Sequence, residues 1–201
     1  MIAILRAQSV RDRVGLAQTL VHAGVTTIEV TATTPDHLAL IERMRTVDGA
    51  VVGIGTVLTA ADVRSAQAAG ARFVVTPIRT AGVERACADR DIPLITGAMT
   101  PTEIHLAAAM AAVVKVFPAR ELGPSYISDL LGPFPDLHLA PSGGVRVGEV
   151  EQYLNAGAIA VGLGSIIPES AAASGDHTVI DELARQALES ARTAGNEVGR
   201  A

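Results

Sequence analysis

Short apolar runs recur along the chain and alternate with longer segments whose apolar residues follow a helical spacing. The runs are rich in valine and isoleucine and too short for independent helices, so each is interpreted as a buried strand. They are IAIL (2–5), TTIEV (26–30), AVVGIG (50–55), RFVV (72–75), IPLIT (92–96), AVVKVF (112–117), LHLA (137–140) and AIAVGLG (158–164). The segments between them, such as 9–24 and 59–70, are predicted to be helices.

Residues at the ends of the helical segments support this division. HAGV, AAGA and NAGA place Gly24, Gly70 and Gly157 just before the next strand, where a helix commonly stops on a left-handed residue. Helix starts are marked by a threonine ahead of the first turn, at Thr34-Pro35-Asp36, Thr59 and Thr100-Pro101. The polar tail after about Thr193 is expected to fray.

A strand followed by a helix, repeated eight times with short connections, predicts an α/β fold, a single-domain (β/α)8 TIM barrel over residues 1–201. An open doubly wound sheet is the main alternative. It usually carries a glycine-rich fingerprint after its first strand, where this chain has Arg6-Ala7-Gln8.

The run AVVKVF contains Lys115, the only lysine among the 16 basic residues of the chain. Because alternate side chains of a strand share a face, Val113, Lys115 and Phe117 point one way and two valines the other. By the same alternation Glu29 points away from Ile28 and Val30 in the second strand. With the aliphatic faces against the helices, Lys115 and Glu29 are predicted to point into the barrel.

This pair has two interpretations. One is a buried ion pair that holds the core, although such pairs rarely stabilise a fold more than apolar residues of equal volume. The other is chemical: burial favours the neutral amine of a lysine, which can attack a ketone to form a Schiff base. A neighbouring carboxylate such as Glu29 can then move the protons. That is the chemistry of a metal-free aldolase.

Other candidate residues follow the strands, at the end of a barrel where active sites lie. Arg6 could bind a carboxylate or phosphate, or be a surface arginine, and Thr56 in VGIGTVL supplies a hydroxyl beside glycines that turn chemistry explains equally well. The loops PSGGV (141–145) and GLGS (162–165) expose backbone N–H groups after the last two strands, a common phosphate position in barrels. Pro77 and Pro118 end strands and could be purely structural.

Composition narrows the function. The 201 residues are 49% hydrophobic with a net charge of −5 and a pI near 5.5, so no basic field is available for nucleic acid or an anionic membrane. No apolar stretch reaches the roughly 18 residues of a membrane span, and no signal peptide is evident. The one cysteine, Cys87, is expected to be inert, and the histidines lack metal-ligand spacing. We therefore expect a cytoplasmic protein with no metal and no cofactor.

Taken together, IAILR, IEVT, GIGTVL, VVTP, VKVFPA, PSGGV and GLGS, in this order, resemble the 2-keto-3-deoxy-6-phosphogluconate (KDPG/KHG) class I aldolase family, with FPARELGPSYISDL similar to the phosphogalactonate branch. The resemblance implies a catalytic barrel, usually a homotrimer, with Lys115 as the Schiff-base residue and Glu29 as the general acid/base. It implies that Arg6 and Thr56 contact the pyruvate portion and that Pro77 and Phe117 shape the pocket wall. The implied phosphate-binding residues are Ser142, Gly143, Gly144, Gly162, Gly164 and Ser165.

Two positions depart from the family pattern. Thr33 stands where many phosphogluconate enzymes have an arginine, and Thr96-Gly97 replaces a Pro-Gly. Neither position belongs to the Lys–Glu pair, so the departures bear on the substrate rather than on the reaction type. Because Thr33 cannot clamp an anion as arginine does, Arg6 is expected to carry more of that role.

The predicted function is cleavage of a 2-keto-3-deoxy-6-phospho sugar acid, of gluconate or galactonate type, to pyruvate and glyceraldehyde 3-phosphate. One alternative is an aldolase for 4-hydroxy-2-oxoglutarate, which gives pyruvate and glyoxylate. Others are a phosphosugar isomerase or epimerase without a covalent intermediate, and a non-catalytic phosphosugar-binding barrel.

Overall fold

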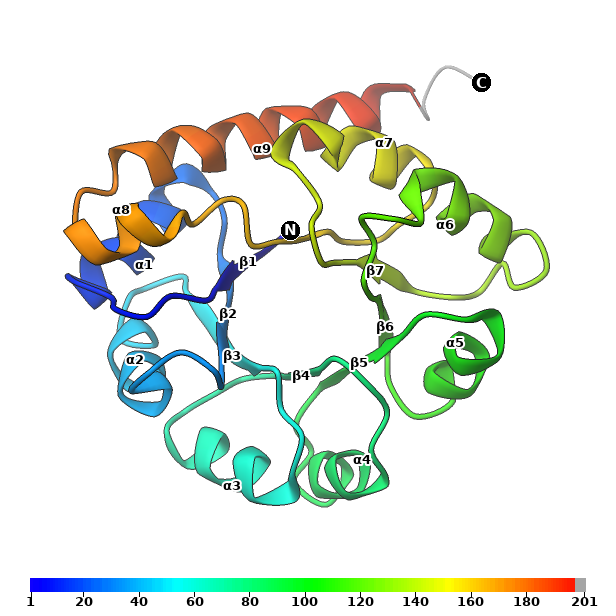
Figure 1. Ribbon diagram of the computed structural model, residues 1–201, viewed down its shortest axis with the longest axis horizontal. Helices are drawn as coiled ribbons and strands as arrows, with labels where there is room; N and C mark the ends of the chain where they lie inside the picture. The colour runs from blue at the N-terminus through cyan, green and yellow to red at the C-terminus, as the bar shows by residue number, and fades with distance from the viewer. Residues whose placement is uncertain (198–201) are drawn as a thin grey trace.

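A computed structural model describes residues 1–197 of the chain, with side chains as far as Ala194, as a ring of strands surrounded by helices (Figure 1). The strands are β1 (Ile2–Leu5), β2 (Thr27–Thr31), β3 (Val51–Gly55), β4 (Val74–Thr76), β5 (Leu94–Ala98), β6 (Val113–Val116), β7 (Leu139–Pro141) and β8 (Gly162–Leu163). The helices are α1 (Arg13–Ala23), α2 (His37–Met44), α3 (Ala60–Ala68), α4 (Ala81–Ala88), α5 (Pro101–Ala108), α6 (Gly123–Leu131), the 3-10 turn η1 (Val147–Glu149), α7 (Val150–Asn155), α8 (Glu169–Ser174) and α9 (Thr178–Glu197).

The sheet is parallel, with strand order β7-β6-β5-β4-β3-β2-β1-β8. A parallel bridge between Ser142 and Gly162 joins its two ends and closes the ring. This confirms the predicted (β/α)8 barrel. The alternative, an open doubly wound sheet, is wrong because the strands follow chain order and the first and last edges meet.

The two faces of each strand have different partners. Outward residues such as Ala3, Leu5, Ile28 and Val30 are fully buried in the apolar layer beneath the helices. The alternate residues, including Glu29, face the interior of the ring. Burial of aliphatic side chains on the outer face is what sends the polar residues inward.

Most of the predicted helix ends are confirmed. Gly24, Gly70 and Gly157 have φ of 100°, 96° and 100°, a left-handed conformation that glycine adopts without strain. Thr59 and Thr100 each accept a hydrogen bond from the backbone in a capping box. The start at Thr34-Pro35-Asp36 differs, because the residue before α2 is Asp36, whose carboxylate makes no cap hydrogen bond.

The C-terminal part of the chain departs most from the predicted elements. The run 158–164 contributes only two residues to β8, since Ile159 donates its N–H to Leu139 before the chain reaches β1. The helix α9 continues past Thr193 to Glu197, where fraying is predicted, and 198–201 lie outside the described residues. This helix packs outside the ring against α1 and α7 (Figure 1).

Candidate active site

The two ionisable residues predicted to share the barrel interior meet there. Lys115 Nζ lies 3.7 Å from Glu29 Oε1, and the exposed fractions of the two residues are 6% and 2%. In the sheet Glu29 stands beside Gly53, and Lys115 stands between Gly97 and Ala140. Small residues therefore flank Lys115 on both sides and Glu29 on one, while the other neighbour of Glu29 is Ile4 on β1.

The electrostatic environment of Glu29 is set by burial. Desolvation raises the pKa of its carboxyl, and the positive charges of Lys115 and Arg6 act against this rise. Among the described residues Glu29 Oε1 has no hydrogen-bond donor, because Lys115 lies beyond hydrogen-bond distance. A carboxyl whose pKa is raised by burial is easier to protonate than an ordinary glutamate, which suits a general acid/base.

Glycine and aromatic residues fix the position of the pair. A Cβ on Gly55 would overlap the carboxyl of Glu29, so the close packing of β3 against this side chain depends on glycine there. On the other side Lys115 Nζ lies 5.3 Å from the centre of the Phe117 ring. The ring face stabilises a positive charge on this nitrogen, whether ammonium or iminium.

Arg6 and Thr56 come together at the carboxyl end of the barrel. The guanidinium of Arg6 donates to Thr56 Oγ1 at 3.5 Å, and Thr56 has a left-handed φ of 58°. Both line a cavity of about 420 Å³, together with Thr33. The structure therefore brings Arg6, Thr56 and Thr33 together, and Thr33 is one of the two positions that depart from the family pattern.

A chain of threonine hydroxyls supports the backbone that carries Arg6. Thr31 Oγ1 lies 3.0 Å from the hydroxyls of both Thr33 and Thr34. Thr34 donates to the carbonyl of Leu5 and accepts from the N–H of Ala7, the two neighbours of Arg6. This role was not predicted from the sequence, although the cluster TATT (31–34) directly follows the predicted strand TTIEV (26–30), which carries Glu29.

Pro77 and Phe117 line a second cavity at the same end of the ring, of about 510 Å³, with Gly97 beside them. A Cβ on Gly97 would overlap the backbone of Pro77, so β4 and β5 approach closely here only because residue 97 is glycine. The adjacent Thr96 is fully buried with its hydroxyl unpartnered among the described residues. In register with Val114, it faces the helices and away from Lys115.

The two glycine loops also lie together. Ser142 pairs with Gly162, and Ser165 Oγ donates to the carbonyl of Val145 at 3.0 Å. Gly143 and Gly144 have φ of 90° and 82°, so the loop after β7 needs glycine at both positions. Gly164 and Ser165 are exposed at the surface of the second loop. All six residues proposed for phosphate thus form one group.

Two arginine contacts were not predicted from the sequence. Arg79, after β4, forms a bidentate ion pair with the buried carboxylate of Glu84 in α4, with N–O distances of 2.8 and 3.2 Å. Arg120, in the loop after β6, lies against Gly144. Neither contact follows from strand alternation. The first joins a loop to the helix that follows it, and the second joins two loops.

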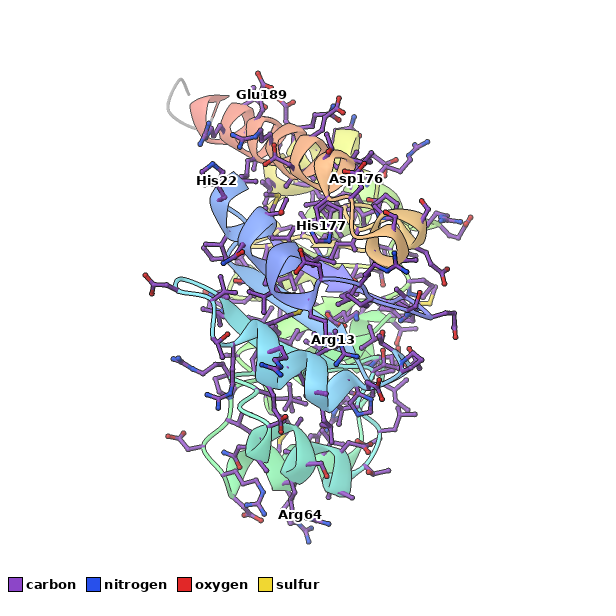
Figure 2. All side chains as sticks on the ribbon, turned by 90° about the vertical axis from the view of Figure 1, so that its left-hand side faces the viewer. Arg13, His22, Arg64, Asp176, His177 and Glu189 are labelled. Atoms are coloured by element: carbon purple, nitrogen blue, oxygen red, sulfur yellow. The ribbon has the colours of Figure 1, made fainter. Side chains whose placement is uncertain are left out.

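The largest of these cavities lies outside the ring. It measures about 910 Å³ between α1 and α9 and is bordered by His22, His177 and Asp181, on the face shown in Figure 2. Asp181 is bound there by Arg185, with an N–O distance of 2.9 Å. The helix layer separates this cavity from Lys115, so it is not the place for the chemistry described above.

Metal-binding and thiol chemistry find little support. Within the described residues, histidine, cysteine and carboxylate side chains form no group of three or more that could hold a metal ion. Burial raises the pKa of the Cys87 thiol to about 11, which keeps it protonated at neutral pH. Helices long and apolar enough to span a membrane are absent from residues 1–197.

Comparison with known proteins gives consistent matches over nearly the whole chain. Residues 1–183 match the family model described as KDPG and KHG aldolase. The chain is 36% identical over 180 residues to a probable 2-dehydro-3-deoxy-6-phosphogalactonate aldolase of Rhizobium meliloti, covering 88% of this chain and 85% of that protein. It is 33% identical over 193 residues to a 2-dehydro-3-deoxy-phosphogluconate aldolase of Treponema pallidum, covering 94% and 92%.

A solved structure agrees with these matches. The KDPG aldolase of Legionella pneumophila, with pyruvate captured as a covalent carbinolamine intermediate, superimposes with a TM-score of 0.84 and 30% identity. The alignment covers 92% of this chain and 91% of that one.

Proposed function

The chain belongs to the KDPG and KHG aldolase family, and on this basis we propose that it is a class I aldolase acting on 2-keto-3-deoxy-6-phospho sugar acids of the gluconate or galactonate type. The products are pyruvate and glyceraldehyde 3-phosphate. The observation that carries this proposal is the sole lysine inside the barrel, 3.7 Å from a buried glutamate. The whole chain acts as one catalytic domain.

The covalent steps use the Lys115 amine and the Glu29 carboxyl. Nζ attacks the C2 ketone to form a carbinolamine. Glu29 then protonates the carbinolamine hydroxyl, which leaves as water and gives the iminium. The iminium then accepts the electron pair of the C3–C4 bond as that bond breaks, while Glu29 takes the C4 hydroxyl proton. Glyceraldehyde 3-phosphate departs, the enamine is protonated at C3, and hydrolysis releases pyruvate and the free amine.

The remaining residues bind the substrate at its two ends. Arg6 and Thr56 hold the carboxylate of the pyruvate portion, supported by their contact at the barrel mouth. Pro77 and Phe117 form the wall of the pocket beside Lys115. The two glycine loops hold the phosphate through their backbone N–H groups and the hydroxyls of Ser142 and Ser165, as their juxtaposition supports.

The protein works as a cytoplasmic homotrimer. Support comes from large apolar side chains left exposed in the loops after three consecutive strands, at Leu58, Ile78 and Met99, with Leu106 on α5 beside them. A patch of this kind is typical of a surface that a partner covers. Sedimentation equilibrium tests the trimer, and a monomer at all concentrations would remove it.

Borohydride reduction in the presence of pyruvate tests the covalent mechanism. Hydride should trap the iminium as a stable adduct on Lys115, which peptide mass spectrometry locates. Lys115→Arg is the matched control, since it keeps the charge but cannot form the imine. If the wild-type protein stays unmodified, the Schiff-base mechanism is rejected. The barrel would then be a non-covalent isomerase or a binding protein.

Cleavage of unphosphorylated 4-hydroxy-2-oxoglutarate is the second candidate function, favoured by Thr33 beside Arg6 in the cavity at the mouth. A hydroxyl there leaves only one guanidinium for anionic groups at this side. Turnover of this substrate and of the phosphorylated sugar acids is compared directly. A higher kcat/KM for 4-hydroxy-2-oxoglutarate would replace the sugar acid as the substrate.

A further inference from the structure

The glycine loops proposed to bind phosphate offer hydrogen-bond donors but no formal positive charge. A phosphate monoester carries a charge of about −1.5 to −2 at neutral pH. A guanidinium adds a full positive charge and a bidentate hydrogen-bonding geometry, which neutral N–H groups do not supply. A cation close to these loops would therefore decide how strongly the chain prefers phosphorylated substrates.

The loop after β6 runs directly alongside the first of these glycine loops. The N–H of Ala119 donates to the carbonyl of Ser142 at 2.8 Å, and the N–H of Arg120 donates to the carbonyl of Gly143 at 3.0 Å. Residue 120 is thereby fixed at the phosphate loop by its own backbone. It is also only five residues beyond the Schiff-base lysine, on the same strand and loop.

The side chain of Arg120 lies against the glycine at the tip of that loop. A Cβ added to Gly144 would fall 3.0 Å from Cζ of the guanidinium and 2.9 Å from Cβ of Arg120, and would overlap Nε. The side chain of the arginine therefore lies along Gly144, which is exposed and has a left-handed φ of 82°. The guanidinium is exposed and stands where the loop ends.

The charge of Arg120 is not committed elsewhere. Within the described residues its guanidinium makes no hydrogen bond and no ion pair. Glu149, whose carboxyl feels the charge of Arg120, has its pKa lowered chiefly by its hydrogen bond with Arg146, and Arg120 is the smallest contributor. Arg146 already holds that carboxylate, with Nε 3.0 Å from Oε1 and the backbone N–H 2.9 Å from Oε2.

We propose that Arg120 binds the substrate phosphate beside the glycine loops and sets the preference for phosphorylated over unphosphorylated substrates. This inference rests on the proposed function. The other cations are placed for different tasks: Lys115 lies at the reacting carbon, Arg6 contacts Thr56 across the mouth, and Arg146 is bound by Glu149. Of these four described cations, Arg120 is the one whose guanidinium lies at the glycine loops without a hydrogen-bonded acid.

The test compares Arg120→Ala and Arg120→Lys with Arg146→Ala, a matched loss of one arginine near the same loop. Each variant is assayed with 2-keto-3-deoxy-6-phosphogluconate and with its unphosphorylated counterpart, 2-keto-3-deoxygluconate. We expect Arg120→Ala to lower kcat/KM for the phosphorylated substrate about 10- to 100-fold, mainly through KM, as loss of a charged hydrogen bond predicts. The loss for the unphosphorylated substrate should be several-fold smaller, and Arg120→Lys should restore part of the binding.

The outcomes separate this inference from the proposed function. Wild-type enzyme that does not distinguish the two substrates would reject a phosphorylated substrate class, and the role of Arg120 with it. Wild-type enzyme that prefers the phosphate, while Arg120→Ala keeps the full preference, would reject Arg120 alone. An equal loss in Arg146→Ala would show a general effect of charge and would also overturn the inference. Borohydride trapping of pyruvate by each variant shows that the covalent site is intact.

Discussion

Glu29 and Glu84 are both buried and both face a basic side chain, yet their surroundings differ. Both oxygens of Glu84 accept hydrogen bonds from Arg79, at 2.8 and 3.2 Å, at the start of a helix outside the barrel. Glu29 lies inside the barrel with Lys115 at 3.7 Å and one oxygen without a hydrogen-bond donor among the described residues. A carboxylate whose two oxygens both accept hydrogen bonds from an arginine suits a structural role. A carboxyl with one oxygen free of donors can exchange a proton more readily. The hydrogen-bond geometry therefore distinguishes the two glutamates, whereas burial does not.

Removing the carboxylate inside the barrel should have the largest effect. We expect Glu29→Gln to lower kcat by about 10²- to 10⁴-fold, the usual contribution of a general acid/base. Because burial raises the pKa of Glu29, the wild-type rate should fall with decreasing pH at a pKa above the ordinary value for glutamate. A pH profile of kcat/KM measures this, and that acidic limb should vanish in Glu29→Gln. A limb that persists in the variant belongs to another group.

Displacing the same carboxylate without removing it sharpens the comparison. Gly55→Ala adds a Cβ that overlaps the Glu29 carboxyl, so this side chain must leave its present position 3.7 Å from Lys115 Nζ. A displacement of about 1 Å at a reacting group costs on the order of 100-fold in rate. Steady-state kinetics and borohydride trapping measure the effect. Gly82→Ala is the control, since the position lies on α4 with open space around a new Cβ. Equal kinetics in the two variants would contradict the placement of Glu29.

Breaking the outer pair should have the opposite signature. We expect Arg79→Ala to lower the free energy of unfolding by about 1–2 kcal/mol at neutral pH, because the buried Glu84 carboxylate loses its hydrogen bonds. Urea denaturation measures this. Because Arg79 also borders the cavity lined by Pro77 and Phe117, any kinetic change should appear in KM, and kcat should stay within about threefold of wild type. Adding Glu84→Gln to Arg79→Ala should recover part of the stability, since no unpaired charge then remains. A large loss of kcat with unchanged stability would reverse the roles assigned to the two glutamates.

The smallest effect is expected from the threonine chain that supports Arg6. Thr34→Val removes the hydroxyl bonded to Leu5 and Ala7, which costs about 1 kcal/mol of stability. KM should rise a few-fold with little change in kcat, because the role proposed for Arg6 is substrate binding and not bond breaking. Thr34→Ser keeps the hydroxyl and should behave as wild type. An unchanged KM in Thr34→Val would show that the position of Arg6 is independent of this chain.

Much of this arrangement can be predicted from the sequence because a strand offers each side chain only two directions. Once Ile28 and Val30 are placed against the helices, Glu29 must face the interior, and the same holds for Lys115. Glycines before the strands could likewise be assigned, since a helix end favours a residue that tolerates positive φ.

Contacts between loops could not be predicted in this way. Arg120 and Gly144 are separated by 23 residues and meet only because the β6 and β7 loops hydrogen-bond to each other. The strand β8 is also shorter than the apolar run predicts, because Ile159 and Val161 make only single backbone hydrogen bonds, to Leu139 and Ile2, ahead of the two paired residues. Alternation determines facing, but neither loop conformation nor the point where pairing begins.

The ring closes through a short connection, a two-residue last strand and one bridge between Ser142 and Gly162. Those two residues also belong to the loops proposed to hold the anionic end of the substrate. An occupied site would therefore act as a clasp across the gap between the final pair of strands. If these loops bind the phosphate as proposed, substrate binding and closure of the barrel depend on the same backbone groups.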